Sequence, residues 1–313
     1  MGKLIGFIGQ GWIGKNYADD FEKRGYEVVR YSMEEPYVQN KEKIKDCDIT
    51  FIAVPTPSTP EGFDSSILRK VVPLVGDFKT AVIKSTLLPG TTESIQKENE
   101  GKFVFHSPEF LTESTAAFDA AHPFRNIVGS PVDNDIYKEK AKEVLEVLPK
   151  APFESICTAK EAELIKYGGN CWFYFKVIYV NMLYDLAEKL GCKWEAVRDA
   201  MAADPRIGSN HLNPVHKSGE SGGEARPGLA YNDVHMVPVH KAGRGAGGHC
   251  FIKDFAAFKK MYEEMVGDQH GKQLLDEMEK KNLDLLISSC KDLDLVKGVY
   301  GEDVLKPASP AGK

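Results

Sequence analysis

The sequence predicts an α/β protein in which a doubly wound parallel sheet is followed by a mostly helical domain built on one long central helix. Three observations support this fold class. Short apolar runs alternate with helical patterns through the first half of the chain, a glycine-rich turn follows the first run, and one helical pattern extends from 158 to 190. Continuous apolar strands separated by helices are typical of a parallel sheet with both faces covered.

Each predicted strand is a short apolar run bounded by turn residues, and each predicted helix repeats apolar positions every three to four residues. The strands are predicted at 4–8, 26–31, 48–54, 80–84, 102–105 and 126–128. The helices are predicted at 12–24, 133–148, 158–190, 193–201, 254–266 and 271–289. We therefore expect a sheet domain over residues 1–150 and a helical domain over 151–313, with a frayed tail from 301.

The long helix begins at a capping box formed by Thr158 and Glu161. At about 1.5 Å per residue it would be roughly 48 Å long, which exceeds one small domain. We therefore expect it to link the two domains or to form the core of a homodimer. Its aromatic residues are expected in the core or at that interface: Trp172, Phe173, Tyr174, Phe175, Tyr179 and Tyr184.

Composition and charge limit the classes of function. The 313 residues are 42% hydrophobic and 27% charged, which is ordinary for a globular protein of about two domains. A net charge of −6 makes nucleic acid a poor partner. No apolar run reaches the ~18 residues that a membrane helix needs, and the N-terminus lacks the features of a signal peptide. We expect a cytoplasmic protein whose six cysteines are reduced thiols.

Gly9, Gly11 and Gly14 form a G-x-G-x-x-G motif between the first predicted strand and the first predicted helix. In that context the motif indicates a dinucleotide-binding, Rossmann-like domain. Gly9 permits a tight turn, Gly11 lets a pyrophosphate approach the backbone, and Gly14 lets the helix pack closely. Trp12 and Ile13 then lie at the helix N-terminus, where free amides face the phosphates.

The end of the second predicted strand decides between NAD and NADP. NAD-binding domains usually have an acidic residue there for the ribose hydroxyl, whereas this chain has Ser32, followed by Glu34 and Glu35. Arg30 and Ser32 could instead favour a 2′-phosphate. Our interpretation is NAD, with NADP as the alternative.

Four further segments contain polar or nucleophilic residues that could take part in binding or catalysis. KSTLLPGTT (84–92) and SPEFLTE (107–113) follow predicted strands, at the sheet edge where ligands bind. Lys166 and Asn170 are four residues apart on the long helix and so share one face. GAGGHCFIKD (245–254) is predicted to bring Cys250 to a helix start, where the helix dipole favours a thiolate.

With these segments, the sequence resembles the UDP-glucose/GDP-mannose dehydrogenases, which oxidise the primary alcohol of a nucleotide sugar to a carboxylate with two NAD. The resemblance extends from about residue 4 to residue 260. It depends on GFIGQGWIG, FIAVPTP, KSTLLPGTT, SPEFLTE, the Lys166/Asn170 pair, DPRIG at 204–208 and GAGGHCFIKD.

The resemblance implies a role for each matching residue. Cys250 corresponds to the nucleophile, Asp254 to the acid near it, and Lys166 and Asn170 to groups that polarise the reacting oxygen. Thr86, Glu109 and Glu113 correspond to residues that position or activate water. Cofactor contacts are implied for Ser32, Val54, Pro55, Thr56, Ser85, Thr86 and Glu113. Substrate contacts are implied for Glu109, Phe110, Leu111, Lys166, Asn170, Arg244, Gly247 and Lys253.

The chemistry of these residue types agrees with that reaction. A cation beside an amide donor stabilises the alkoxide that develops as an alcohol loses a hydride. A thiolate can add to the resulting aldehyde as a thiohemiacetal, and a second oxidation gives a thioester that water hydrolyses. Glu109 is our first choice for the base that activates this water.

Two departures from the family concern the substrate. Typical members continue through a further nucleotide-binding domain, so the resemblance identifies this chain as a short form that lacks it. The segment between Gly208 and Gly245 is also longer than usual. We hypothesise that Arg226, Lys241 and Arg244 in that segment contact the phosphates of a nucleotide sugar.

Other interpretations remain open at this point. The chain could be a two-electron dehydrogenase of the 6-phosphogluconate or 3-hydroxyacid type, or a non-catalytic nucleotide-sugar binding protein. Cys250 could serve packing only, Glu109 and Glu113 could begin a surface helix, and the Lys166/Asn170 pair could be solvated. The sequence predicts no metal site, with one alternative that uses loop histidines: His211, His216, His235, His240 and His249.

Overall fold

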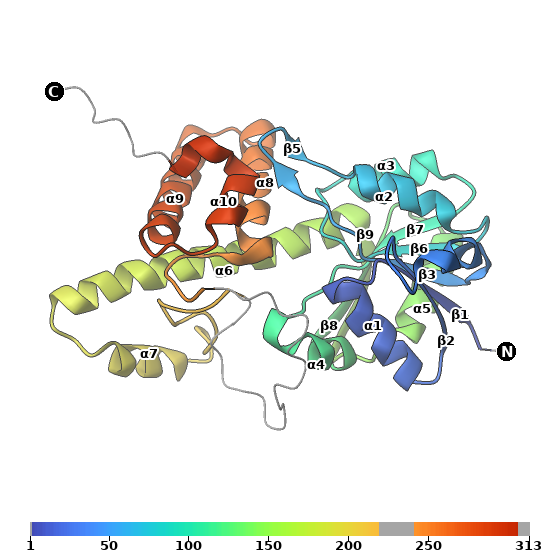
Figure 1. Cartoon of the computed structure of the whole chain (residues 1–313), viewed down its shortest axis with the longest axis horizontal. Helices are drawn as coiled ribbons and strands as arrows, with labels where there is room; N and C mark the ends of the chain where they lie inside the picture. Colours follow the sequence, from blue (N-terminus) through green and yellow to red (C-terminus); the bar gives the residue numbers. More distant parts are fainter. Residues whose placement is uncertain (1, 219–240, 306–313) are drawn as a thin grey trace. The chain divides into compact units, whose positions relative to one another are not determined.

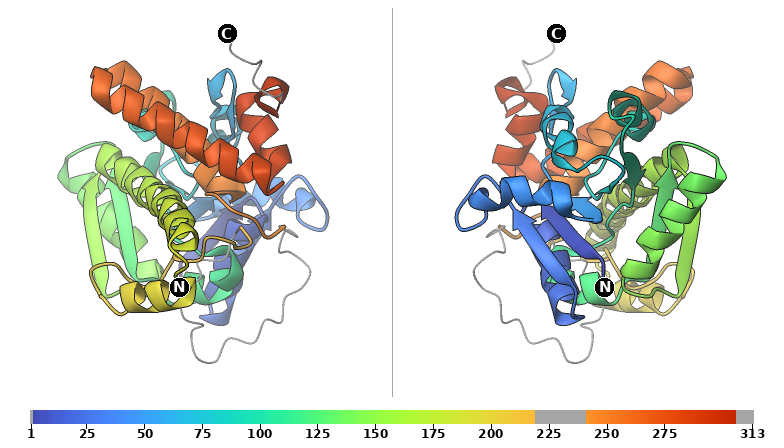
Figure 2. Two further views of the ribbon diagram at one scale, coloured as in Figure 1. Left: turned by 90° about the vertical axis from the view of Figure 1, so that its left-hand side faces the viewer. Right: turned by 90° about the vertical axis from the view of Figure 1, so that its right-hand side faces the viewer.

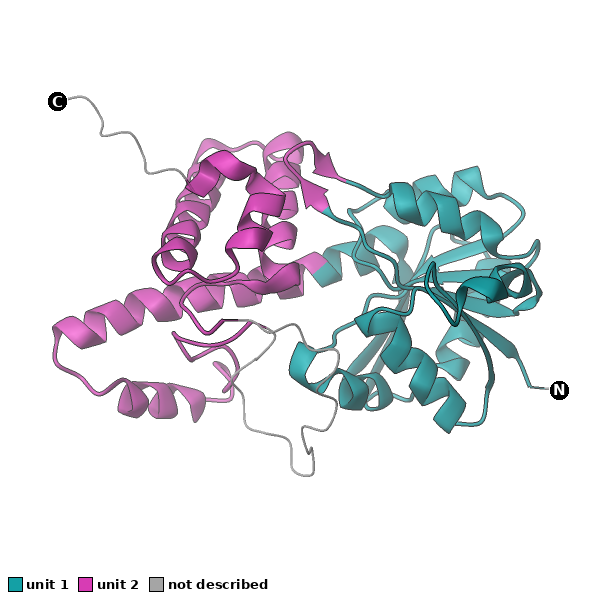
Figure 3. Cartoon of the chain, viewed as in Figure 1, with its two compact units in different colours: residues 1–57, 64–166 teal, residues 58–63, 167–313 magenta. Residues whose placement is uncertain are grey.

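The computed structural model describes residues 2–218 and 241–305. The chain divides into two compact units, one of residues 1–57 and 64–166 and the other of residues 58–63 and 167–313 (Figure 3). The sheet unit extends past residue 150 because a strand at Phe153–Thr158 joins the sheet. The long predicted helix is α6 (Ala159–Lys189), and the division between the units falls within it.

Seven strands form the sheet of the first unit, in the order β2-β1-β3-β6-β7-β8-β9 (Figure 1). They are β1 (Leu4–Ile8), β2 (Glu27–Tyr31), β3 (Ile49–Ile52), β6 (Thr80–Ile83), β7 (Phe103–His106), β8 (Arg125–Ser130) and β9 (Phe153–Thr158). The predicted strands and the fold class are confirmed, and β9 is an addition.

One junction differs from a wholly parallel sheet, because β8 runs antiparallel to β7. The segment between them contains only η3 (Glu113–Thr115) and the short helix α4 (Ala116–Ala121), which packs against α1 (Trp12–Lys23). The chain therefore does not return to the starting edge of the sheet, as a parallel crossover requires.

One hydrophobic cluster of the first unit lies on one face of this sheet, and residues of the opposite face, such as Ile52 and Ile83, are buried as well. Phe7, Phe51 and Phe105 point to that face and pack against α1, α4 and α5 (Asp135–Val147). Phe21 of α1 meets Phe7 edge to face, with 5.3 Å between ring centroids. Shorter elements complete the unit: η1 (Val38–Asp46), α2 (Ser66–Val71), η2 (Val72–Leu74) and α3 (Thr91–Glu98).

The second unit is mostly helical. Its helices are the rest of α6, then α7 (Trp194–Ala202), α8 (Gly248–Met265), α9 (Gln269–Ser288), α10 (Leu293–Tyr300) and η4 (Glu302–Leu305). Helices α8, α9 and α10 pack on one another (Figure 2), and the hairpin of β4 (Ser58–Thr59) and β5 (Gly62–Phe63) contacts α8 and α10. Helix α8 begins at Gly248, earlier than the sequence predicted, so Cys250 lies within its first turn.

The aromatic residues of α6 divide into two groups. Tyr174 is buried and stacks on Phe255 of α8 with 3.9 Å between ring centroids. Trp172 and Tyr179 are exposed. The helix therefore contributes both to the core of its unit and to an apolar outer face.

Candidate active site

The glycine turn has the geometry that the motif predicts. Gly9 has φ +91°, and a Cβ there would lie 2.2 Å from the carbonyl oxygen of Ala53. A Cβ on Gly14 would lie 1.9 Å from the carbonyl oxygen of Gly9, so this position also requires glycine. Gly11 is the N-cap of α1, and the space beside its Cα is open. A helix N-terminus with room at the backbone is suited to a pyrophosphate.

Arg30 is already bound by carboxylates of α1. Its Nη2 lies 2.7 Å from Asp19 Oδ1 and 2.7 Å from Glu22 Oε2, and the side chain is buried. Ser32, at the end of β2, exchanges hydrogen bonds with the backbone of Glu34. A 2′-phosphate would therefore have to compete with two carboxylates for Arg30.

The loops after β3 and β6 are joined by side-chain hydrogen bonds. Ser85 Oγ accepts from the amide of Val54 at 3.0 Å and donates to the carbonyl of Val54 at 2.7 Å. Thr56 Oγ1 donates to the carbonyl oxygen of Thr86 at 2.8 Å. The predicted cofactor contacts Val54, Pro55, Thr56, Ser85 and Thr86 thus lie together at one edge of the sheet.

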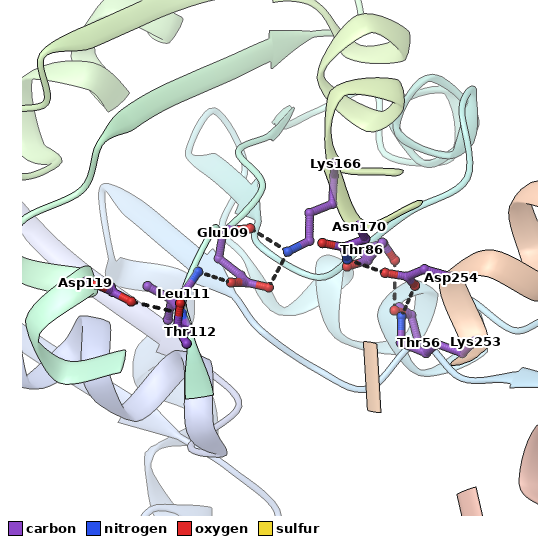
Figure 4. A network of polar contacts seen from close by, with 10 residues as sticks. All are labelled: Thr56, Thr86, Glu109, Leu111, Thr112, Asp119, Lys166, Asn170, Lys253 and Asp254. Atoms are coloured by element: carbon purple, nitrogen blue, oxygen red, sulfur yellow. Dashed lines mark hydrogen bonds and ion pairs between the residues drawn. The ribbon is translucent and has the colours of Figure 1, made fainter. Parts of the chain in front are cut away.

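Glu109 and Lys166 form a buried ion pair (Figure 4). Lys166 Nζ donates to Glu109 Oε1 at 2.8 Å and to the Glu109 carbonyl oxygen at 2.7 Å. Glu109 Oε2 accepts from the amide of Leu111 at 2.7 Å. The ring of Phe110 lies beneath Lys166 Nζ, with 5.6 Å to its centroid. Two residues that the sequence placed in separate segments therefore form one network.

Two buried basic side chains near this network were missed by the sequence analysis. Lys84 Nζ donates to Ser107 Oγ at 3.0 Å and lies 4.6 Å from the ring centroid of Tyr17. Burial lowers the pKa of Lys84 to about 7 and that of His106 to about 3. A basic residue type at the end of an apolar strand was the available signal, and both residues have that position.

Glu163 also had no role assigned from sequence, although it lies one helical turn before Lys166. Its buried carboxylate accepts from the amides of Gly90 and Thr92 at 2.6 and 2.8 Å, and from Thr92 Oγ1 at 2.6 Å. Burial raises the pKa of this carboxyl group despite those bonds. Glu163 thereby caps α3, whose own N-cap, Gly90, has no side chain.

A second polar network lies in the second unit (Figure 4). Asn170 Nδ2 donates to Asp254 Oδ2 at 2.6 Å, and Lys253 Nζ lies 2.5 Å from Asp254 Oδ1. Asp254 is buried, whereas Cys250, one turn earlier on α8, is exposed. The six cysteines all lie in the described ranges, and none of them forms a disulfide. The predicted acid and the predicted nucleophile thus share one helix.

The remaining predicted residues have other partners. Arg244 donates to Asn181 and pairs with Asp185 of α6 at 2.7 Å, which gives it a structural role, and its contact with substrate stays a prediction. Glu113 lies in η3. Arg226, His235 and His240 lie outside the described residues.

The described histidines of this segment have other partners. His211 stacks on Phe173, and His216 contacts Lys291. Within the ranges that the structure describes, no three His, Cys, Asp or Glu residues form a group that could hold a metal ion. Nor does any helix in those ranges combine the length and apolarity needed to cross a membrane.

Solved structures share this fold. A UDP-glucose dehydrogenase from Pyrobaculum islandicum superposes with a TM-score of 0.72 at 23% identity, over 92% of this chain and 70% of that one. A 3-hydroxyisobutyrate dehydrogenase from Mycobacterium tuberculosis superposes with a TM-score of 0.60 at 16% identity, over 91% of this chain and 96% of that one. At these identities the likeness concerns the fold alone.

Curated relatives are similar in sequence. Putative UDP-glucose 6-dehydrogenase YtcA of Bacillus subtilis is 28% identical over 236 residues, which covers 72% of this chain and 48% of the relative. UDP-glucose 6-dehydrogenase AglM of Haloferax volcanii is 25% identical over 303 residues, which covers 81% of this chain and 64% of the relative. The chain thus spans about half to two thirds of their length.

Two family models match consecutive parts of the chain. The NAD binding domain of the UDP-glucose/GDP-mannose dehydrogenase family matches residues 33–148, and the central domain of the same family matches residues 160–230. Together these matches cover more than half of the sequence, and they include the Glu109–Lys166 pair and Asn170. The chain therefore belongs to the UDP-glucose/GDP-mannose dehydrogenase family.

Proposed function

We propose that the protein is an NAD-dependent nucleotide-sugar 6-dehydrogenase, which oxidises the primary alcohol of a UDP-glucose-like substrate to the uronic acid. One observation is central to the proposal. Cys250 is an exposed thiol in the first turn of α8, directly after a glycine-rich loop, in a chain of this family. A two-electron dehydrogenase has no need of such a thiol, whereas in a four-electron oxidation a thiol retains the aldehyde between the two oxidations.

The residues around the glycine turn suit the cofactor. The open backbone at Gly11 and the start of α1 would hold the pyrophosphate, and the tied loops of Val54–Thr56 and Ser85 would border it. NAD, when bound, accepts the hydride that leaves the substrate carbon. The engagement of Arg30 by Asp19 and Glu22 supports NAD over NADP.

Lys166 and Asn170 are proposed to act on the reacting oxygen. They lie one turn apart on α6, so both side chains project from the same face of one helix. Lys166 is a buried cation, and Asn170 is oriented by its bond to Asp254. A cation and an amide donor fixed in this way stabilise a developing alkoxide without reorganisation. Glu109, bonded to Lys166, can accept the proton.

Cys250 and Glu109 are proposed to complete the oxidation. The Cys250 thiolate adds to the aldehyde as a thiohemiacetal, which the second oxidation converts into a thioester. Glu109 activates the water that releases the acid, and Thr86 positions it. Phe110, Leu111, Gly247 and Lys253 are proposed to contact the substrate, with Lys241 and Arg244 near its phosphates.

Alternative functions differ in a quantity that can be counted. A two-electron dehydrogenase of the 6-phosphogluconate or 3-hydroxyacid type yields one NADH per substrate, whereas the proposed enzyme yields two. A non-catalytic nucleotide-sugar binding protein yields none. The buried Glu109–Lys166 pair and the exposed Cys250 favour catalysis, since a binding protein needs neither.

The decisive experiment incubates the protein with NAD and a panel of UDP- and GDP-sugars and counts NADH per acid formed. We expect two NADH for one sugar of the panel. Cys250→Ala should abolish acid formation, because no thiol then retains the aldehyde. Cys192→Ala, which removes another exposed thiol, should retain activity. Full acid yield from Cys250→Ala would refute the proposed mechanism.

A further inference from the structure

The glycine-rich loop before Cys250 is held by side chains from the C-terminal half of α9 and the turn that follows it. Asn282 bonds both backbone groups of Ala246, at 2.7 Å to the amide and 3.0 Å to the carbonyl. Ser289 Oγ accepts from the amide of Arg244 at 3.0 Å. The loop therefore owes its shape to residues more than thirty positions later in the chain.

Lys291 is the most buried of these side chains, with no exposed surface. Its Nζ lies 3.0 Å from the carbonyl oxygen of Gly245, 3.4 Å from that of Gly243, and 3.1 Å from His216 Nε2. His216 Nδ1 in turn lies 3.0 Å from the carbonyl oxygen of Asn213, which fits a neutral ring. Burial, followed by the charge of Lys291, lowers the pKa of His216 to about 3. Lys291 Nζ thus binds two carbonyl groups of the loop at once.

Asp292 holds the other end of the same loop. Its Oδ2 accepts from the amide of Gly248 at 2.7 Å and from Ser218 Oγ. Gly247, the N-cap of α8, has no side chain, so Asp292 supplies the cap from 44 residues away. A carboxylate at this position also interacts favourably with the helix dipole.

The backbone around this pair makes the turn that ends α9 and leads into α10. Cys290 and Asp292 both have positive φ, at +52° and +51°, although neither is glycine. Cys290 occupies the left-handed position that commonly ends a helix, and the amides of Cys290 and Lys291 donate to the carbonyl oxygens of Ile287 and Leu286 at 3.0 and 2.9 Å. On the loop side, a Cβ at Gly247 would lie 2.2 Å from Asp292 Oδ2 and 3.0 Å from Lys291 Cε. Position 247 therefore has room only for a glycine, because Asp292 and Lys291 pack directly against it.

We propose that Lys291 and Asp292 are positioning residues for Cys250: together they fix the loop of residues 243–248 and the first turn of α8, and so set where the thiol meets the substrate aldehyde. The proposal rests on the proposed function. Neither residue has a role in the motifs that identify the family. Their contribution to catalysis would be the placement of Cys250, and neither would touch the reacting atoms.

The experiment uses the full chain and the variants Asp292→Asn and Lys291→Met. Asp292→Asn keeps the shape and removes the charge, and Lys291→Met removes the donors to Gly243 and Gly245. Matched controls are Asp294→Asn and Lys280→Met, which change exposed residues of α10 and α9. We expect peptide-resolved hydrogen exchange over 243–250 to speed up about tenfold or more in both test variants and in neither control.

Catalysis provides the readout that a purely structural role would not change. We expect kcat to fall about tenfold or more at unchanged KM for NAD, and the NADH count per sugar to fall from two towards one, because the aldehyde escapes a misplaced thiol. The rate of Cys250 alkylation by iodoacetamide should change, while that of Cys192 stays constant. If Lys291→Met does not fold, Ser218→Ala, which removes one donor to Asp292, replaces it.

Unchanged loop exchange in the test variants would overturn the proposal. Faster exchange with unchanged kcat, NADH count and alkylation rate would overturn it too, since the pair would then only stabilise the fold. Should the wild-type protein oxidise no nucleotide sugar, the proposed function fails. Exchange and alkylation still decide the positioning role in that case, because neither requires turnover.

Discussion

Lys84 stands at the end of β6 with its ammonium group fully buried, and this burial lowers its pKa to about 7. The unfolded chain therefore holds more protons than the folded chain between about pH 7 and pH 10, so Lys84 makes stability rise with pH in that window. Below pH 7 the full penalty of the buried charge remains. We predict that Lys84→Met is more stable than the wild type at pH 6, by roughly 2–5 kcal/mol, and that the difference shrinks as the pH approaches 10.

Urea unfolding at pH 6, 8 and 9.5 measures this difference for Lys84. Lys297→Met, which changes a lysine that is not buried, is the matched control and should show no comparable dependence on pH. A stability difference between Lys84→Met and the wild type that stays constant from pH 6 to 9.5 would contradict the assignment of a lowered pKa to this lysine.

The Glu109–Lys166 pair has two separable effects. Both side chains are buried, so Glu109→Gln leaves an uncompensated cation and should lower the free energy of unfolding by roughly 3–5 kcal/mol. The double variant Glu109→Gln/Lys166→Met should recover most of that loss, because no charge then remains. Neither variant should recover kcat. Urea unfolding and NADH formation, measured on the same preparations, test this, and a double variant as unstable as Glu109→Gln would argue against a mutually compensating pair.

Among the elements, α3 and α8 begin at glycine N-caps and take their capping carboxylates from distant helices or turns, Glu163 for α3 and Asp292 for α8. Glu163→Ala should therefore destabilise the protein by about 1–3 kcal/mol, since it leaves two amides without their acceptor. Glu161→Ala, which removes the exposed capping box of α6, is the matched control, with an expected loss of at most about 1 kcal/mol. Equal losses in thermal or urea unfolding would show that the cap from Glu163 stabilises the protein no more than the local capping box does.

Elements that depend on local spacing could be predicted from the sequence, whereas strand direction and long-range bonds could not. The strands, the long helix, the glycine turn and the capping box of Thr158 depend on local spacing, and the structure confirms them. The direction of β8 and the pairing of β9 depend on how the connections return to the sheet, which spacing does not report. The bonds of Glu109 to Lys166 and of Asn170 to Asp254 join residues 57 and 84 positions apart. Only the family resemblance brought those residues together in advance, and it offered no role for Lys84, Glu163 or Asp292.

At the level of the whole molecule, the outer face of α6 is a candidate contact between two copies of the chain. Its exposed apolar residues follow heptad-like steps of seven, three and four: Trp172, Tyr179, Met182 and Leu186, continued by Leu190 just after the helix. A stripe of this kind on one helix is self-complementary, and a two-fold axis would place it against the same stripe of a second chain. We therefore propose the homodimer that the length of the helix suggested.

Charge introduced into that stripe should separate the two copies. The double variant Tyr179→Lys/Leu186→Lys places like charges opposite one another in a two-fold contact, so we predict a monomer where the wild type is a dimer, with Kd raised at least about a hundredfold. Sedimentation velocity over a concentration series measures this shift. Met265→Lys, which adds the same charge at an exposed apolar residue of α8, should leave the dimer intact. A wild-type protein that sediments as a monomer at every concentration would contradict the homodimer. A charged variant that dimerises like the wild type would show that the contact lies elsewhere.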